Sequence, residues 1–172
     1  MDLNVTMELV DKHVKEGRGN KIAYYQLNSD GELIYSIRYS ELLERVNRFG
    51  SALRNVIGLR EEERVLIIMP DTIEAVIAFL GTVRMGGIAA LINFKLTKDD
   101  YLYAANLIRA RVLITDASHL NMALEIKQKV KSLWKIILTP APGENHFTND
   151  TRSMEEDVIL FGDLIGKGSP EF

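Results

Sequence analysis

The loop at residues 93–98 contains the residue types best suited to binding chemistry in this sequence. It follows an apolar run and leads into Thr97 and Asp100, a pair typical of a helix start. A loop between a strand and a helix N-terminus points main-chain amides at a ligand, and Lys95 and Lys98 add compact charges that suit phosphate. Two lysines in a loop are more often a solvated surface, so composition alone assigns no function here.

The turn at residues 69–72 also runs from strand to helix, but it has the marks of a structural cap. Asp71 and Glu74 are spaced as a variant of the capping box, and Asp71 would repel a phosphate at this helix start. The only glycine pair, Gly86-Gly87, follows a helix and precedes a strand, which is the reverse of a phosphate loop. We interpret that pair as a helix stop.

No group of residues has the spacing of a catalytic or metal site. His13, His119 and His146 lie in separate segments, and no serine has a paired histidine. The sequence has no cysteine, which excludes disulfides, thiolate metal sites and a cysteine nucleophile, and fits a reducing cytoplasm. We therefore expect no catalytic residue and no metal ligand in these 172 residues.

Charge and hydropathy narrow the class of protein further. The formal net charge is -3, the pI is about 5.7 and the 21 basic residues are dispersed, which argues against a nucleic-acid partner. No apolar run approaches the ~20 residues of a membrane span, and the acidic, amphipathic N-terminus is unlike a signal peptide. We expect a single α/β domain, without a membrane span, located in the cytoplasm.

The first third of the chain predicts a helix, a hairpin and a second helix. A helix is expected over residues 4–15, with Val5, Leu9, Val10 and Val14 on its buried face. Strands are expected at 22–27 and 33–39, joined by a turn that contains Asp30-Gly31. Ser40 is expected to cap the long helix that follows, and Gly58 to end it.

The remaining chain alternates apolar runs with capped helical segments. This alternation predicts a parallel βαβ sheet with helices on both faces. The expected strands are Val65–Met69, Ile88–Ile92, Val112–Thr115 and Lys135–Thr139, of which the first two are expected to be buried on both faces. Residues 140–157 are rich in Pro, Gly, Asn and Asp, so we expect a mobile surface loop, followed by a short apolar element at 158–165.

The ordered series of segments resembles the N-terminal part of the adenylate-forming, AMP-binding superfamily and is most similar to its benzoate-type CoA ligases. Its members convert a carboxylic acid with ATP into an acyl-AMP and then transfer the acyl group to CoA. The matching positions are mostly core and cap positions, so they identify ancestry better than chemistry. They are YSEL at 39–42, VNRFGSAL at 46–53, ERVL at 63–66, M-x-DT at 69–72, AFLG at 78–81, MGG at 85–87, N-x-x-LT-x-DDY-x-Y at 93–103 and RARVL at 109–113.

The resemblance implies one binding residue in this chain. In the aryl-CoA ligases a basic residue in the loop after the second parallel strand contacts a CoA phosphate. Lys95 occupies the matching place, two residues after Asn93, although Phe94 stands where the family often has proline. The family's Ser/Thr-Gly-rich-Lys loop for ATP lies beyond Phe172, so ATP, Mg and CoA are expected for an intact ligase and no cofactor for this chain alone.

The sequence leaves several alternatives open. The chain is an inactive N-terminal piece of an acid:CoA ligase, aryl-type or fatty-acid-type, or a stand-alone α/β scaffold, or part of another adenylate-forming enzyme. Residues 168–172 resemble the sequence before the phosphate loop and also a cloning-vector linker. The acid is not readable, because its pocket is built mainly from later residues. The expected partner is the remainder of the ligase, and exposed apolar surface predicts self-association.

Overall fold

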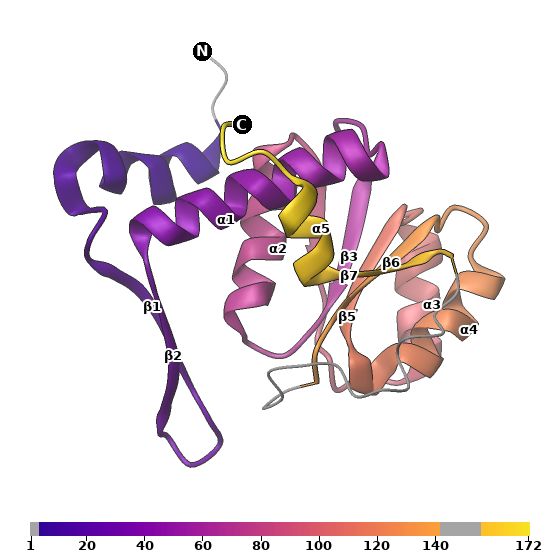
Figure 1. Ribbon diagram of the computed structural model, residues 1–172. Coiled ribbons are helices and arrows are strands. Elements are labelled where there is room, and N and C mark those ends of the chain that lie inside the picture. Colours follow the sequence, from indigo (N-terminus) through magenta and orange to yellow (C-terminus); the bar gives the residue numbers. More distant parts are fainter. Residues whose placement is uncertain (1–3, 142–155) are drawn as a thin grey trace.

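A five-stranded parallel sheet forms the centre of the protein (Figure 1). The structure is a computed structural model that describes residues 4–141 and 156–172. The strand order is β4-β3-β5-β6-β7, and each pairing is parallel. The strands are β3 (Arg64–Ile68), β4 (Ile88–Leu91), β5 (Val112–Asp116), β6 (Lys135–Thr139) and β7 (Val158–Leu160). The expected parallel sheet is confirmed, whereas the loop expected at 140–157 lies mostly outside the described residues.

Helices cover both faces of this sheet, as the sequence predicted. Alternate residues of β3 face opposite layers: Val65 and Ile67 pack with α1, α2 and α5, whereas Leu66 and Ile68 pack with α3 and α4. These four side chains are buried, which explains the unbroken apolar run. The helices are α1 (Tyr39–Ala52), α2 (Ile73–Arg84), α3 (Lys98–Leu107), α4 (Leu120–Lys129) and α5 (Phe161–Lys167), with short turns η3 (Leu53–Ile57) and η4 (Ala117–His119).

The first helical segment packs through a different face from the one predicted. It contains two wide turns, η1 (Met7–Asp11) and η2 (Val14–Arg18), and Gly17 within η2 has φ +78°. Val5 is 45% exposed and Leu9 is 50% exposed, whereas Val10 is buried. The apolar spacing was misleading because the buried face also carries Thr6, which donates to the carbonyl of Leu80, and Asp11, which pairs with Arg84.

The hairpin stands apart from the main sheet, and one strand of that sheet is more exposed than the sequence indicated. The hairpin strands β1 (Ile22–Leu27) and β2 (Leu33–Arg38) form a separate antiparallel sheet that projects from the body (Figure 1). β4 was expected to be buried on both faces, but it is the edge strand of the main sheet, with Ile88 48% exposed and Leu91 52% exposed. The apolar run at β4 therefore predicted a strand correctly. It did not show that this strand lies at the edge of the sheet, with a neighbouring strand on only one side.

Two predicted helix caps are wrong, by two residues at α1 and by one residue at α2, and two other predicted helix ends are confirmed. α1 begins at Tyr39 after Arg38, so Ser40 lies inside the helix. α2 is capped by Thr72, whose hydroxyl accepts from the amide of Ala75, rather than by Asp71. The Thr97–Asp100 capping box is present, and Gly58 ends η3 in the left-handed conformation. Within the described residues, no helix is long and apolar enough to cross a membrane.

Candidate functional site

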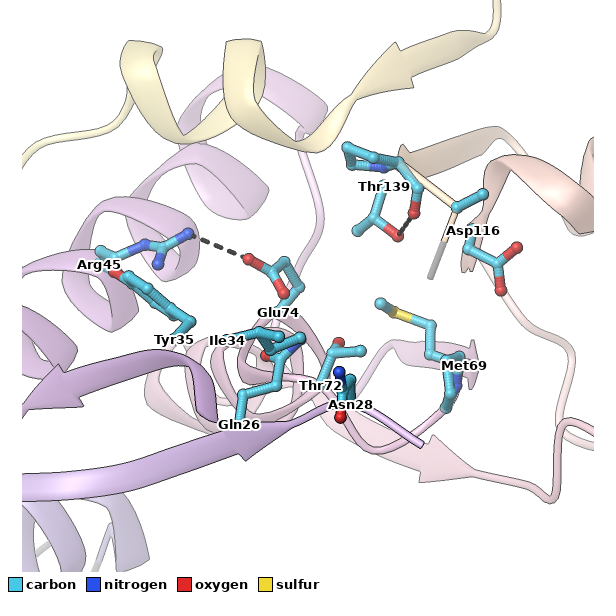
Figure 2. A pocket seen from close by; sticks show the side chains of 13 residues that line it. Gln26, Asn28, Ile34, Tyr35, Arg45, Met69, Thr72, Glu74, Asp116 and Thr139 are labelled. Carbon is cyan, nitrogen blue, oxygen red and sulfur yellow. Dashed lines mark hydrogen bonds and ion pairs between the residues drawn. The ribbon is translucent and has the colours of Figure 1, made fainter. Parts of the chain in front are cut away.

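A cleft of about 710 Å³ opens at the carboxyl ends of β3, β5 and β6 (Figure 2). This is the edge of a parallel sheet at which α/β proteins usually bind their ligands. The hairpin forms one wall of the cleft, and the turn before α2 forms another. The lining residues come from five parts of the chain: Gln26, Asn28, Ile34, Tyr35, Arg45, Met69, Pro70, Thr72, Glu74, Asp116, Thr139, Pro140 and Ala141.

Hydrogen bonds fix the wall formed by the hairpin. The side-chain oxygen of Gln26 accepts from the amide of Ile73, at 2.9 Å, and so ties β1 to the start of α2. The hydroxyl of Tyr35 donates to Glu41 at 2.6 Å, and burial together with this hydrogen bond raises the pKa of Tyr35. These bonds hold an isolated two-stranded hairpin, which is marginal alone, against the helical layer.

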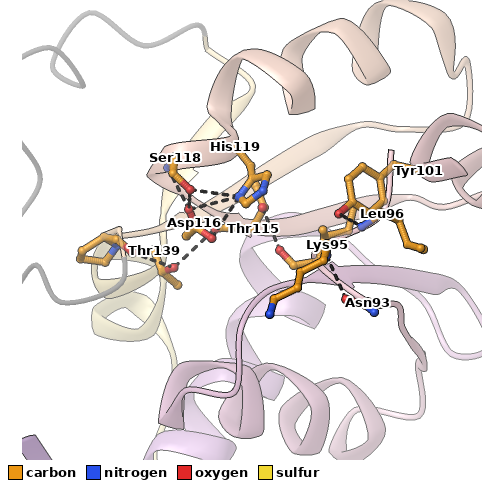
Figure 3. A network of polar contacts seen from close by, with 11 residues as sticks. Asn93, Lys95, Leu96, Tyr101, Thr115, Asp116, Ser118, His119 and Thr139 are labelled. Carbon is orange, nitrogen blue, oxygen red and sulfur yellow. Dashed lines mark hydrogen bonds and ion pairs between the residues drawn. The ribbon is translucent and has the colours of Figure 1, made fainter. Parts of the chain in front are cut away.

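Asp116 is a buried carboxylate in the floor of the cleft that the sequence analysis did not single out. It is 1% exposed and ends β5, and its Oδ1 accepts from the amide of Ser118 at 2.8 Å (Figure 3). The hydroxyl of Ser118 also donates to it. The sequence did contain a signal for this cap. Asp116 and Ser118 form an Asp-x-Ser pattern directly after the predicted strand, and an Asp side chain commonly accepts from the amide two residues further on.

The Ser118–His119–Asp116 group is not a nucleophilic triad. Ser118 Oγ lies 3.1 Å from His119 Nδ1, and Asp116 Oδ2 lies 3.2 Å from the same nitrogen. A proton relay needs the acid and the nucleophile on opposite ring nitrogens, because one nitrogen cannot serve both partners. The geometry therefore describes a local cap at the start of η4. The expectation that no serine has a paired histidine is wrong for Ser118, but this pair lacks the arrangement of a proton relay.

The predicted loop lies along the same edge of the sheet, beyond the cleft. The side-chain oxygen of Asn93 accepts from the amide of Lys95 at 2.9 Å, and the hydroxyl of Tyr101 accepts from the amide of Leu96 at 3.1 Å (Figure 3). The Thr97 capping box fixes the other end of the loop. Thus Asn93 shapes the turn, and it leaves the Lys95 side chain exposed.

The two loop lysines differ in their availability for a ligand. Lys98 Nζ lies 2.6 Å from the carboxylate of Glu125, and this hydrogen bond raises the pKa of Lys98. Lys95 forms no ion pair with any residue in the described ranges, and its Nζ lies 5.6 Å from the Phe94 ring centroid. An exposed ammonium without a carboxylate partner is the better donor for a phosphate, and only Lys95 meets that description in this loop.

The candidate site contains no ready-made metal centre. Over residues 4–141 and 156–172, no group of three or more His, Asp or Glu side chains is placed to hold a metal ion. Asp116 is the most buried carboxylate of the cleft, and its oxygens are already used by Ser118 and His119.

Known proteins resemble this chain in both sequence and fold. The family described as AMP-binding enzyme matches residues 10–161. A 4-hydroxybenzoate–CoA/benzoate–CoA ligase of Rhodopseudomonas palustris is 33% identical over 144 residues, 82% of this chain and 25% of that protein. A benzoate–CoA ligase of Thauera aromatica is 34% identical over 142 residues, 83% of this chain and 26% of that protein.

A solved structure extends the similarity to nearly the whole chain. The anthranilate CoA ligase AuaEII, crystallised with anthranoyl-AMP, superposes with a TM-score of 0.77 at 26% identity. The match covers 97% of this chain and 29% of that ligase. This chain therefore spans about a quarter of the length of the curated relatives that it matches.

Proposed function

This chain belongs to the AMP-binding enzyme family, and from that premise we propose that it is the N-terminal part of an AMP-forming, aryl-type carboxylic acid:CoA ligase. The observation that supports this function best is the identity of 33–34% to two benzoate-type CoA ligases over more than four fifths of the chain. The intact ligase converts an aryl acid and ATP into acyl-AMP and pyrophosphate. The thiol of CoA then displaces AMP from the acyl group.

Lys95 is the residue of this chain that we assign to CoA. Its ammonium is exposed at the carboxyl edge of the sheet, and the described residues provide it with no ion-pair partner. Asn93 contributes indirectly, because it accepts from the amide of Lys95 and fixes the turn. The donor set therefore fits a CoA phosphate, which a lysine binds as a point charge.

ATP does not fit the residues of this chain in the same way. Stabilising charge on the α-phosphate needs preorganised donors, a cation or Mg²⁺. The sequence has no glycine-rich loop between a strand and a helix, and Asp116 is a buried anion in the floor of the cleft. We therefore propose that the 172 residues alone lack ligase activity and that ATP and Mg bind to later parts of the intact ligase.

The remainder of the ligase is the partner that this chain needs. Large apolar side chains are exposed on the edge strand β4 and on α3, where Tyr103 is 69% exposed and Leu107 is 67% exposed. Such surface normally lies in an interface. We propose that later parts of the ligase cover it in the intact enzyme, that the isolated chain associates with itself through it, and that the enzyme acts in the cytoplasm.

The formation of CoA thioesters by the intact ligase tests this function. The purified enzyme is incubated with MgATP, CoA and a panel of benzoate, hydroxybenzoates, anthranilate, acetate and long-chain fatty acids, and thioesters are identified by mass spectrometry. We expect an aryl-CoA product and AMP. A product from fatty acids or acetate only would move the protein to another branch of the family, and an acyl-AMP without thioester would point to a different adenylate-forming enzyme.

A further inference from the structure

The last five residues, 168–172, form a strap that lies against α1 and near the N-terminal helix (Figure 1). Three side chains of α1 hold its backbone. Asn47 donates to the carbonyl of Pro170 at 2.7 Å, Arg48 donates to the carbonyl of Gly168 at 3.0 Å, and Ser51 accepts from the amide of Ser169 at 3.1 Å. The strap is thus hydrogen-bonded along its length.

Close packing shows that the strap fits this surface specifically. A Cβ added at Gly168 would lie 1.9 Å from the carbonyl oxygen of Arg48, so only glycine allows this approach. The ring of Phe172 lies close to Gly50, where an added Cβ would be 3.3 Å from it, and the Arg54 guanidinium is 5.0 Å from its centroid. The strap is therefore closely packed against α1 as well as hydrogen-bonded to it.

Arg84 connects the strap to the N-terminal helix. At the end of α2, its Nε and Nη2 donate to the main-chain oxygen of Phe172 at 3.1 and 2.7 Å; Phe172 is the last residue of this chain, so this oxygen is part of a carboxylate here and is a peptide carbonyl oxygen when residues follow. Its Nη1 donates to Asp11 at 2.6 Å, and both side chains are largely buried, at 13% and 9% exposure. Asn4 also donates to the carbonyls of Val83 and Arg84. Both ends of the described chain therefore meet at one guanidinium.

The chemistry of this junction requires arginine. The planar guanidinium offers donors in two fixed directions, one set toward Asp11 and the other toward Phe172, which a lysine ammonium cannot reproduce. Asp11 balances the buried positive charge, so the pair can remain ionised away from water. Arg84 therefore binds the N-terminal helix and the strap at the same time.

We infer that Arg84 is a positioning residue, which latches the 168–172 strap onto α2 and so fixes the starting point of the chain that follows Phe172 in the ligase. The second half of this inference rests on the proposed function. Arg84 acts through the strap and contacts no reacting atom. Loss of the latch therefore removes no catalytic group, but it misplaces the segment that continues from the strap.

Four substitutions in the 172-residue chain separate the latch from general stability. Arg84→Gln removes both sets of bonds, Asp11→Asn weakens only the link to the N-terminal helix, and Gly168→Ala displaces only the strap. Gly166→Ala is the matched control, because an added Cβ there meets nothing within 4 Å. NMR reports the contact between the Phe172 ring and Gly50 together with amide exchange at Ser169.

We expect Arg84→Gln and Gly168→Ala to abolish the contact between Phe172 and Gly50 and to speed Ser169 exchange about tenfold or more, the change expected from losing one hydrogen bond to a charged group. Asp11→Asn and Gly166→Ala should keep the contact. If Arg84→Gln keeps the contact, or speeds every slow amide by the same factor, Arg84 is not a latch.

The intact ligase tests the second half of the inference. With the acid that it uses, Arg84→Gln and Gly168→Ala should lower acid-dependent exchange of pyrophosphate into ATP by about tenfold, while Gly166→Ala retains the wild-type rate. An unchanged rate in Arg84→Gln would overturn the positioning role. If the wild-type ligase shows no exchange with any acid, the proposed function fails, and the NMR comparison still decides whether the latch exists.

Discussion

Replacing Gly81 with alanine tests the close approach of α1 and α2. An added Cβ would lie 2.8 Å from Cδ1 of Phe49 and 3.2 Å from the amide nitrogen of Gly50. Phe49 is fully buried and stacks on Phe161 with ring centroids 4.8 Å apart, so its ring has little room to withdraw. A methyl group at position 81 must therefore push the two helices apart or force the ring from its rotamer.

Two opposing terms set the size of the effect. Overpacking a closed core site costs about 1–3 kcal/mol, whereas Gly→Ala inside a helix gains up to about 1 kcal/mol in propensity. The net expectation for Gly81→Ala is a loss of about 1–2 kcal/mol in the free energy of unfolding. Gly166→Ala in α5, where an added Cβ meets nothing within 4 Å, should instead gain a few tenths to about 1 kcal/mol.

Urea unfolding of the 172-residue chain, followed by circular dichroism, measures both variants against the wild type. The midpoint should fall for Gly81→Ala and rise for Gly166→Ala. If both midpoints move in the same direction, or Gly81→Ala unfolds no earlier than the wild type, the helices do not depend on this close contact and the packing described for α1 and α2 is wrong.

Three further predictions concern charge, CoA binding and association. Hydrogen bonds from Lys127 and Lys135 lower the pKa of Asp157 to about 2, so its stabilisation is present above about pH 4 and is lost as the pH falls toward 2. Asp157→Asn should cost on the order of 1 kcal/mol at pH 7, after discounting for solvent exposure, and only a small part of that at pH 2 in urea titrations; a constant difference would contradict this. In the intact ligase, Lys95→Ala should raise the KM for CoA roughly tenfold or more, since a hydrogen bond between charged groups contributes about 1.5–3 kcal/mol, and should leave adenylation unchanged. Lys131→Ala is its exposed control, and equal effects on adenylation and CoA kinetics would refute the assignment. The apparent mass of the isolated chain should rise with concentration in sedimentation experiments, and a strict monomer at high concentration would count against self-association.

Local signals in the sequence predicted most of the fold. The strand positions followed from apolar runs, and the Thr97–Asp100 box and the Gly58 stop followed from residues whose conformational preferences act within one turn. Errors arose where a neighbour distant in sequence decides the outcome. Asp11 is buried because it pairs with Arg84, and β4 is half exposed because it has a partner strand on only one side.

The candidate site was less predictable than the fold for the same reason. The loop at Asn93 and Lys95 could be identified because strand, loop and helix start are consecutive. The cleft could not, because it joins the hairpin, α1, the turn before α2 and the ends of β5 and β6. Asp116 illustrates the difference. Its burial in the floor of the cleft depends on the neighbouring strands and on the cap at Ser118, and the spacing of residues in the sequence does not reveal that burial.

Acid-dependent exchange of labelled pyrophosphate into ATP, measured in parallel for the 172-residue chain and the intact ligase, tests the central claim most directly. We expect benzoate or a substituted benzoate to support exchange by the intact ligase and no acid to support exchange by the chain alone. Exchange catalysed by the isolated chain would show a nucleotide site within it, and an intact protein inactive with every aryl acid would contradict its assignment as an aryl-CoA ligase.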